Sequence, residues 1–141
     1  MNNTSQAATT ILVVDDEAIA LEFCRATLTR AGYKVLTAAS GDQAIRWFQA
    51  GRSSIALALL DVVMPCMTGA ELAQRILELC PETRIVLMSG YAPDEVERIV
   101  GNDAARYRSM WKPFEAETLV QMIRNVLGEP PPATAKRARS G

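Results

Sequence analysis

Short apolar runs alternate with helix-like patterns five times along this chain of 141 residues. The first and third runs, residues 10–14 and 55–60, are apolar at nearly every position, as expected for strands that are buried on both faces. Weaker runs cover residues 34–38, 84–88 and 107–110. This alternation predicts an α/β fold with an open parallel sheet and helices on both of its faces.

Apolar residues spaced three and four positions apart predict the helices between these strands. The third helix is predicted to begin at Gly69, and the last helix to cover residues 115–127 and to end at Gly128. Their predicted inner faces consist of Leu72, Ile76 and Leu79 on the third helix and of Leu119, Met122, Ile123 and Val126 on the last. The pattern alone does not give the order of the strands.

Length and composition predict one folded domain with two short flanking segments. Hydrophobic residues make up 49% of the chain, which is enough for one sizeable core. Residues 1–9 are polar and are predicted to be a flexible N-terminus, and residues 10–128 form the predicted domain. Residues 129–141, with three consecutive prolines and then small and basic residues, are predicted to be a disordered tail.

The net charge of −1 gives no general attraction to nucleic acids or anionic lipids, so no specific nucleic-acid partner is expected. Cys24, Cys66 and Cys80 have no metal-ligand spacing and the chain has no histidine, so reduced thiols are expected. The N-terminus lacks the pattern of a secretion signal, and no apolar stretch approaches about 20 residues. We therefore expect a cytoplasmic protein without membrane contact, as a monomer or weak dimer.

Polar residues stand at the carboxyl ends of four predicted strands. Asp15 and Asp16 follow the first strand, Asp61 the third, Ser89 the fourth and Lys112 the fifth. Ligands of open parallel sheets sit beyond the carboxyl ends of the strands. The sequence therefore predicts that these five side chains meet in one crevice.

Three carboxylates beside one ammonium group predict a site that needs a cation. Two like charges about 4 Å apart repel by roughly 4 kcal/mol at an effective dielectric constant of 20, so a divalent ion or a raised carboxyl pKa must relieve them. Oxygen ligands favour magnesium or manganese over zinc. Asp61 stands alone after the most apolar run and is the best candidate for a nucleophile that forms an aspartyl phosphate. Lys112 would neutralise the phosphoryl oxygens, and Ser89 would donate its hydroxyl to them.

Four motifs together resemble the receiver domain of bacterial response regulators, and the likeness covers about residues 10–128. These motifs are Asp15-Asp16, Asp61-Val62-Val63-Met64-Pro65 with Met67-Thr68-Gly69, Met88-Ser89-Gly90, and Lys112-Pro113-Phe114. The resemblance implies a doubly wound, flavodoxin-like fold whose five parallel strands have the order 2-1-3-4-5. It also implies a cis peptide bond between Lys112 and Pro113.

For the site, the resemblance implies that Asp61 receives its phosphoryl group from a phosphohistidine. That phosphohistidine belongs to a sensor histidine kinase or a histidine phosphotransfer protein. It implies that Mg²⁺ is held by Asp16, Asp61 and the carbonyl of Val63, with Asp15 acting mainly through water. Lys112 completes this set as the catalytic cation. These residues would make the chain a phosphoacceptor in a two-component or phosphorelay pathway rather than an enzyme with an external substrate.

The chain departs from the family at Ser109, where receivers usually carry Tyr or Phe three residues before the lysine. Tyr107 lies two residues earlier and is predicted to point to the same face of the strand. Tyr91 and Trp111 are further candidates to substitute for the missing ring. The departure leaves phosphorylation credible and leaves the route of signal transmission open.

Output is expected through contact with a downstream protein, because the chain shows no effector domain of its own. One alternative is a Mg²⁺-dependent phosphohydrolase that uses an aspartyl intermediate. Such an enzyme would need an acid or base near the nucleophile, commonly an aspartate two residues later, where this chain has Val63. Another alternative is a scaffold of the same fold that is not phosphorylated.

Overall fold

A computed structural model of the protein describes residues 9–50, 54–101 and 106–129. The predicted flexible N-terminus and the predicted tail therefore lie outside the described residues, apart from Thr9 and Glu129. Glu129 contacts the folded domain, because its Oε1 accepts a hydrogen bond of 2.8 Å from the hydroxyl of Tyr33.

Five parallel strands form one sheet, in the order β2-β1-β3-β4-β5. The strands are β1 (Thr10–Val14), β2 (Lys34–Ala38), β3 (Ile55–Asp61), β4 (Arg84–Ser89) and β5 (Arg108–Trp111). All five predicted strands are present, and the implied order is confirmed. β3 and β4 extend one residue beyond their predicted ends, so Asp61 and Ser89 belong to the sheet itself. β5 lies one residue later than the predicted range 107–110, so Tyr107 precedes the strand and Trp111 ends it.

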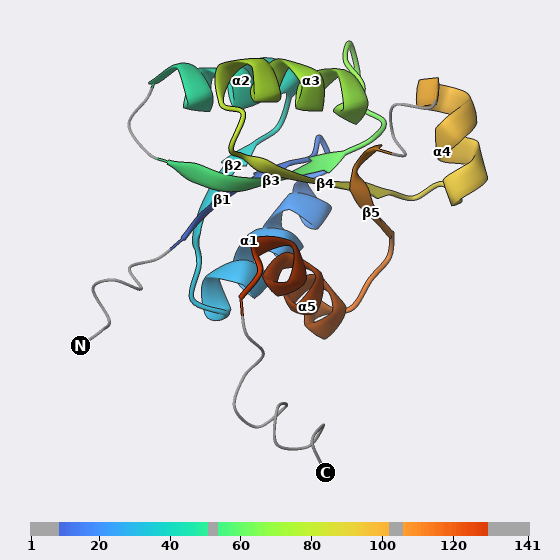
Figure 1. The fold of residues 1–141 in the computed structure, drawn as a ribbon. Helices are drawn as coiled ribbons and strands as arrows, with labels where there is room; N and C mark the ends of the chain where they lie inside the picture. The colour runs from blue at the N-terminus through green and yellow to red at the C-terminus, as the bar shows by residue number, and fades with distance from the viewer. Residues whose placement is uncertain (1–8, 51–53, 102–105, 130–141) are drawn as a thin grey trace.

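Helices cover both faces of the sheet, as Figure 1 shows. They are α1 (Ala18–Arg30), α2 (Gly41–Ala50), α3 (Gly69–Leu79), α4 (Pro93–Val100) and α5 (Ala116–Leu127). In Figure 1, α2 and α3 lie above the sheet, α1 and α5 lie below it, and α4 stands at the side where β5 forms the edge. The doubly wound α/β fold is therefore confirmed.

No helix in the described part of the chain is long and apolar enough to cross a membrane.

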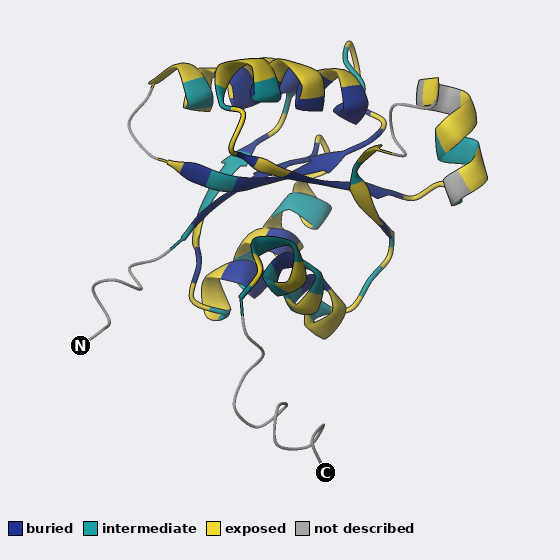
Figure 2. Ribbon diagram, viewed as in Figure 1, coloured by how far each residue is buried: buried dark blue, intermediate teal, exposed yellow. Residues whose placement is uncertain are grey.

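Alternate residues of the central strands supply two hydrophobic cores, one on each face of the sheet. On β1, Leu12 and Val14 belong to the core beneath α2 and α3, whereas Ile11 and Val13 belong to the core against α1 and α5. Figure 2 shows the central strands as almost entirely buried. Burial on both faces explains why these strands are continuous apolar runs.

The predicted inner faces of the helices hold with one exception. Leu72 and Ile76 of α3 are fully buried, as are Leu119 and Ile123 of α5. Leu79 was predicted to face inward, but its side chain is 50% exposed. It is the last residue of α3, where the chain turns away toward β4, so the spacing continues past the point where the helix covers the sheet.

Candidate functional site

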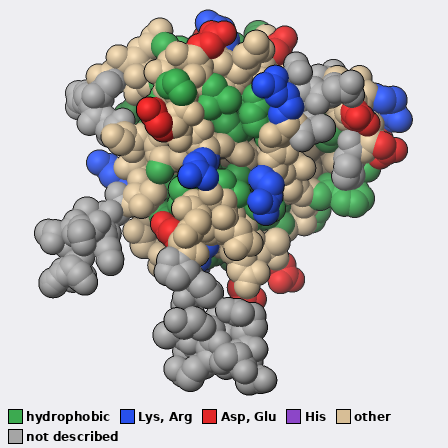
Figure 3. Space-filling view, in the orientation of Figure 1, with side chains coloured by type: hydrophobic (Ala, Val, Ile, Leu, Met, Phe, Trp, Pro, Cys, Tyr) green, Lys and Arg blue, Asp and Glu red, His purple; other side chains and the backbone are tan. Residues whose placement is uncertain are grey.

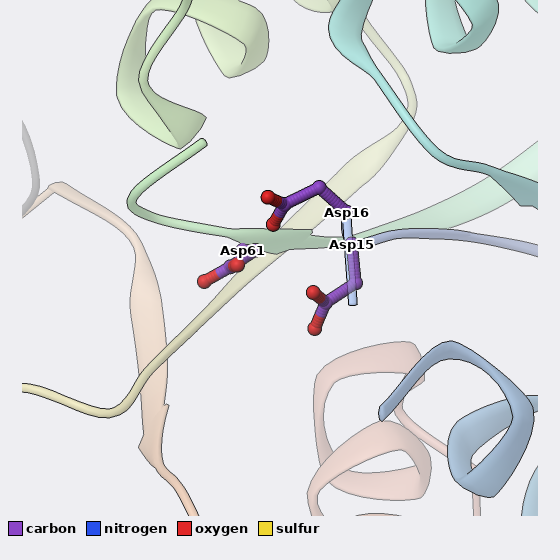
Figure 4. Close-up of side chains that lie close together, drawn as sticks. All are labelled: Asp15, Asp16 and Asp61. Atoms are coloured by element: carbon purple, nitrogen blue, oxygen red, sulfur yellow. The ribbon is translucent and has the colours of Figure 1, made fainter. Parts of the chain in front are cut away.

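The carboxyl ends of β1 and β3 bring three carboxylates together, as Figure 4 shows. One carboxylate oxygen from each of Asp15, Asp16 and Asp61 lies within 4.8 Å of the others. Asp15 is fully buried, Asp61 is 6% exposed and Asp16 is exposed. The three side chains thus form a cluster that is closed toward the sheet and open to solvent at Asp16.

Lys112, which follows β5, lies beside this cluster. Its Nζ lies 2.8 Å from Oδ2 of Asp15, 3.7 Å from Oδ2 of Asp61 and 3.7 Å from Oε1 of Glu17. The backbone N–H of Lys112 donates to the carbonyl of Ser89 at 2.7 Å, which ties the lysine to the end of β4. The peptide bond after Lys112 is cis, as the resemblance implied.

Asp15 connects the lysine to the start of α1. Its Oδ1 accepts the backbone N–H of Glu17 at 2.9 Å, and its Oδ2 accepts the ammonium of Lys112 at 2.8 Å. Both oxygens are therefore engaged with the protein, which suits a residue that orients Lys112. Glu17 was not among the predicted site residues, although an acidic residue two positions after a strand-end aspartate was a usable signal.

The surroundings of Asp61 oppose its negative charge. Burial and then the nearby charge of Asp15 raise the pKa of Asp61 from 3.8 to about 7, while Lys112 and a backbone hydrogen bond from Val63 act in the opposite direction. Burial and the charge of Asp15 together thus outweigh the ammonium group of Lys112. A bound cation would remove this imbalance and favour the ionised form of Asp61.

Lys112 stays charged in this environment. Burial disfavours its ammonium form, but the hydrogen bond to Asp15 and the charges of Asp61, Asp15 and Glu17 together outweigh burial and raise the pKa of Lys112. The site therefore contains a fixed positive charge beside the Asp61 carboxylate.

The loop after Asp61 is held to its neighbours by backbone hydrogen bonds. The N–H of Val62 donates to the carbonyl of Met88 at 2.9 Å, and the carbonyl of Val62 accepts the N–H of Gly69 at 2.8 Å. A Cβ at Gly69 would collide with the carbonyl oxygen of Asp61 and approach Cα of Val62 to 3.0 Å. A glycine is required there because α3 begins in direct contact with the end of β3.

Ser89 lies buried at the end of β4, beside Trp111 in the register of the sheet. Its Oγ accepts the backbone N–H of Tyr91 at 2.9 Å, which leaves the hydroxyl proton available for donation. Tyr107 is partly buried against the core beneath α2 and α3, whereas Ser109 is exposed. Tyr107 and Ser109 line the same hollow beside α4, although Tyr107 precedes β5 and does not belong to the strand.

The donor set fits a hard divalent cation. The clustered atoms of Asp15, Asp16 and Asp61 are all carboxylate oxygens, which are ligands that Mg²⁺ takes readily. The pKa of Asp61 is raised by burial and by the charge of Asp15, so a bound cation would favour its ionised form. Val63, whose carbonyl was expected to be a further ligand, lies in the loop next to this cluster and is partly exposed.

Comparisons with known proteins identify relatives over most of the chain. The sequence model described as the response regulator receiver domain matches residues 11–124. The chain is 32% identical over 123 residues to the sensor kinase CckA of Brucella abortus, covering 87% of this chain and 13% of the kinase. It is 30% identical over 135 residues to the DNA-binding transcriptional regulator NtrC of Azospirillum brasilense, covering 96% of this chain and 27% of the regulator. The chain thus spans less than a third of the length of either relative.

A solved structure supports the same comparison. The response regulator protein TrrA from Thermotoga maritima, crystallised in complex with Mg²⁺-BeF, is 27% identical to this chain and superposes with a TM-score of 0.72. The match covers 84% of this chain and 98% of that protein.

Proposed function

Because the chain belongs to the response regulator receiver domain family, we propose that Asp61 is the residue through which it takes part in two-component signalling. Asp61 accepts a phosphoryl group from a phosphohistidine of a sensor histidine kinase or a histidine phosphotransfer protein. The observation that carries the proposal is the position of the Asp61 carboxylate, clustered with Asp15 and Asp16 and 3.7 Å from the ammonium of Lys112.

In the reaction, a carboxylate oxygen of Asp61 attacks the phosphorus of the phosphohistidine. The new O–P bond forms as the N–P bond breaks, and the imidazole leaves with the electron pair and takes a proton from solvent. The protein contributes mainly by positioning and charge. Lys112 is close enough to Asp61 to neutralise an oxygen of the transferred phosphoryl group, and Asp15 holds the lysine in that direction.

Mg²⁺, bound by Asp16, Asp61 and the carbonyl of Val63, would supply the positive charge that the phosphoryl oxygens and the carboxylates both need. Asp15, which is hydrogen-bonded to Lys112, would act on the ion mainly through water. Ser89 lies at the end of the neighbouring strand with its hydroxyl proton available, and it donates this proton as a hydrogen bond to the phosphoryl group once transfer is complete.

The chain acts on its own aspartate and has no external substrate to turn over. An aspartyl-phosphate hydrolase would need an acid or base beside the nucleophile, and the position two residues after Asp61 is occupied by apolar Val63. Output passes through contact with a downstream protein rather than with nucleic acid. The chain works in the cytoplasm as a monomer or weak dimer.

Phosphorylation in vitro tests this proposal. The parent chain, mixed with a phosphorylated histidine kinase and Mg²⁺, should gain one phosphoryl group by mass spectrometry, and the label should be lost with hydroxylamine. Asp61→Asn should not be labelled, and Asp42→Asn, which changes an exposed acid on α2, should be labelled like the parent. Equal labelling of Asp61→Asn and the parent would exclude Asp61 as the acceptor.

A further inference from the structure

A hollow separates α4 from the end of the sheet formed by β4 and β5. Its volume is about 520 Å³, and its lining includes Tyr91, Asp94, Glu97, Tyr107, Ser109 and Trp111. Ser109 and Trp111 alternate along β5 and share one of its faces, and Tyr107 lies two positions before Ser109, just ahead of the strand. Because Ser109 is small, it leaves a gap between two aromatic residues. Figure 1 shows α4 at the edge of the sheet that β5 forms.

The aromatic residues of the hollow are available to a ligand. Trp111 is 58% exposed and Tyr91 is 45% exposed, while Tyr107 is only partly buried. The faces of aromatic rings carry negative charge and attract cations, with tryptophan the strongest of the three ring types. Three such residues around one hollow therefore favour a positively charged group.

The charged residues of the hollow point to the same chemistry. Asp94 and Glu97 of α4 both line it, and no Lys or Arg is among its lining residues in the described part of the chain. Arg98 also lies on α4 but does not contribute to the lining. Glu95 does not line it either, and its Oε1 accepts the backbone N–H of Ala92. In Figure 3, acidic side chains lie over α4, with basic side-chain atoms beside them.

The size of the hollow favours a long side chain over a small ion. A volume of about 520 Å³ falls in the range of sites that bind drug-sized molecules, and an isolated ammonium ion would fill little of it. Val96 and Met110 add apolar surface to the lining. Lysine and arginine pack their hydrocarbon stems on apolar surface while their charged ends reach polar groups.

We propose that the hollow binds a lysine or arginine side chain of a partner protein. The charged end lies between the aromatic residues and the carboxylates of Asp94 and Glu97, and the stem lies against Val96. This binding goes beyond phosphoryl transfer and does not require it, so it is measured without Mg²⁺ or a phosphodonor. Failure of either proposal therefore leaves the other standing.

Trp111 provides the readout. The chain has two tryptophans, so Trp47→Phe leaves Trp111 as the only one, and its fluorescence reports on the hollow. This protein is titrated with a capped pentapeptide that has one central arginine, and with the same peptide carrying glutamine instead. The arginine peptide should bind saturably and about tenfold more tightly than the glutamine peptide, and its affinity should fall as salt is added.

Variants test which groups bind the cation. Asp94→Asn with Glu97→Gln should weaken binding of the arginine peptide about tenfold, whereas Glu117→Gln, on the exposed side of α5, should leave the affinity within about twofold. Ser109→Phe should fill the gap and abolish binding. Circular dichroism of each variant checks that the fold is retained.

Three results would overturn the proposal. The first is equal binding of the arginine and glutamine peptides with no effect of the Asp94 and Glu97 substitutions. The second is equally tight binding of tetramethylammonium, which would make the ligand a small organic cation and not a side chain of a protein. The third is tighter peptide binding after Lys136, Arg137 and Arg139 are all changed to glutamine, which would make this chain's own basic segment the occupant.

Discussion

Replacing Asp61 by asparagine should stabilise the fold when divalent cations are absent, and the gain should grow as the pH rises. Burial and the charge of Asp15 raise the pKa of Asp61 in the folded protein from 3.8 to about 7. Between these two pH values the folded chain retains a proton that the unfolded chain has released, so stability falls as the pH rises. The protonated carboxyl of Asp61 makes its full contribution to the free energy of unfolding below pH 3.8, and this contribution is lost as the pH rises past about 7.

The size of the stability difference follows from the interval between about pH 5 and the raised pKa of Asp61, about 7. One pKa unit corresponds to about 1.4 kcal/mol, so two units give an upper value of about 3 kcal/mol. Water at the open side of the cluster reduces this value. We therefore expect the stability advantage of Asp61→Asn over the parent to increase by about 1–3 kcal/mol between about pH 5 and pH 8.

Urea denaturation in the presence of a chelator measures this advantage at the two pH values. Asp42→Asn serves as the control, because it removes an exposed acid on α2 and should show no such increase. Adding Mg²⁺ at the higher pH should stabilise the parent more than Asp61→Asn. The reasoning would be refuted by an advantage that is the same at both pH values, or by a variant that becomes relatively less stable as the pH rises.

Three further predictions concern the same site. Lys112→Met leaves the buried carboxylate of Asp15 without its ion-pair partner. It should lower the free energy of unfolding by about 3 kcal/mol in chelator and by less in Mg²⁺, as measured by urea denaturation. Gly69→Ala forces α3 away from the end of β3. It should lower the free energy of unfolding by about 1–3 kcal/mol and weaken Mg²⁺ binding, as measured by calorimetry. Gly90→Ala serves as the control and should do neither, because Gly90 has open space around it. Cys24 should react with a thiol reagent far more slowly than exposed Cys66 in the native protein, because burial raises the pKa of Cys24 to about 12. Mass spectrometry measures the two rates, and equal rates would contradict this prediction.

The fold was largely predictable because the sheet is buried on both faces. Strands such as β1 and β3 must be apolar throughout under that condition, so their positions are visible in the sequence. The strand order was not visible in this way, because every helix can cross to either neighbouring strand, and it came only from the resemblance to receiver domains. Leu79 was placed wrongly because residue spacing does not show where a helix stops covering the sheet.

The site was predictable to the extent that its residues terminate strands. Asp15, Asp61 and Ser89 take their positions from backbone that the core already fixes. Glu17 was missed because its approach to Lys112 depends on the direction in which α1 leaves β1. The hollow beside α4 could not be predicted from the sequence either, because its volume depends on the distance between α4 and β5.

The site is also where the fold departs from what stability alone would favour. A strand as apolar as β3 would gain from an apolar last residue, yet it ends in Asp61, whose charge the surroundings oppose. Asp15 is fully buried, and an ion pair buried in this way is rarely better for stability than apolar residues of similar size. A polar cluster that opposes folding in this way is expected at functional sites. The same buried negative charges that oppose folding in chelator attract a divalent cation, so the parent should lose more stability than Asp61→Asn when Mg²⁺ is removed.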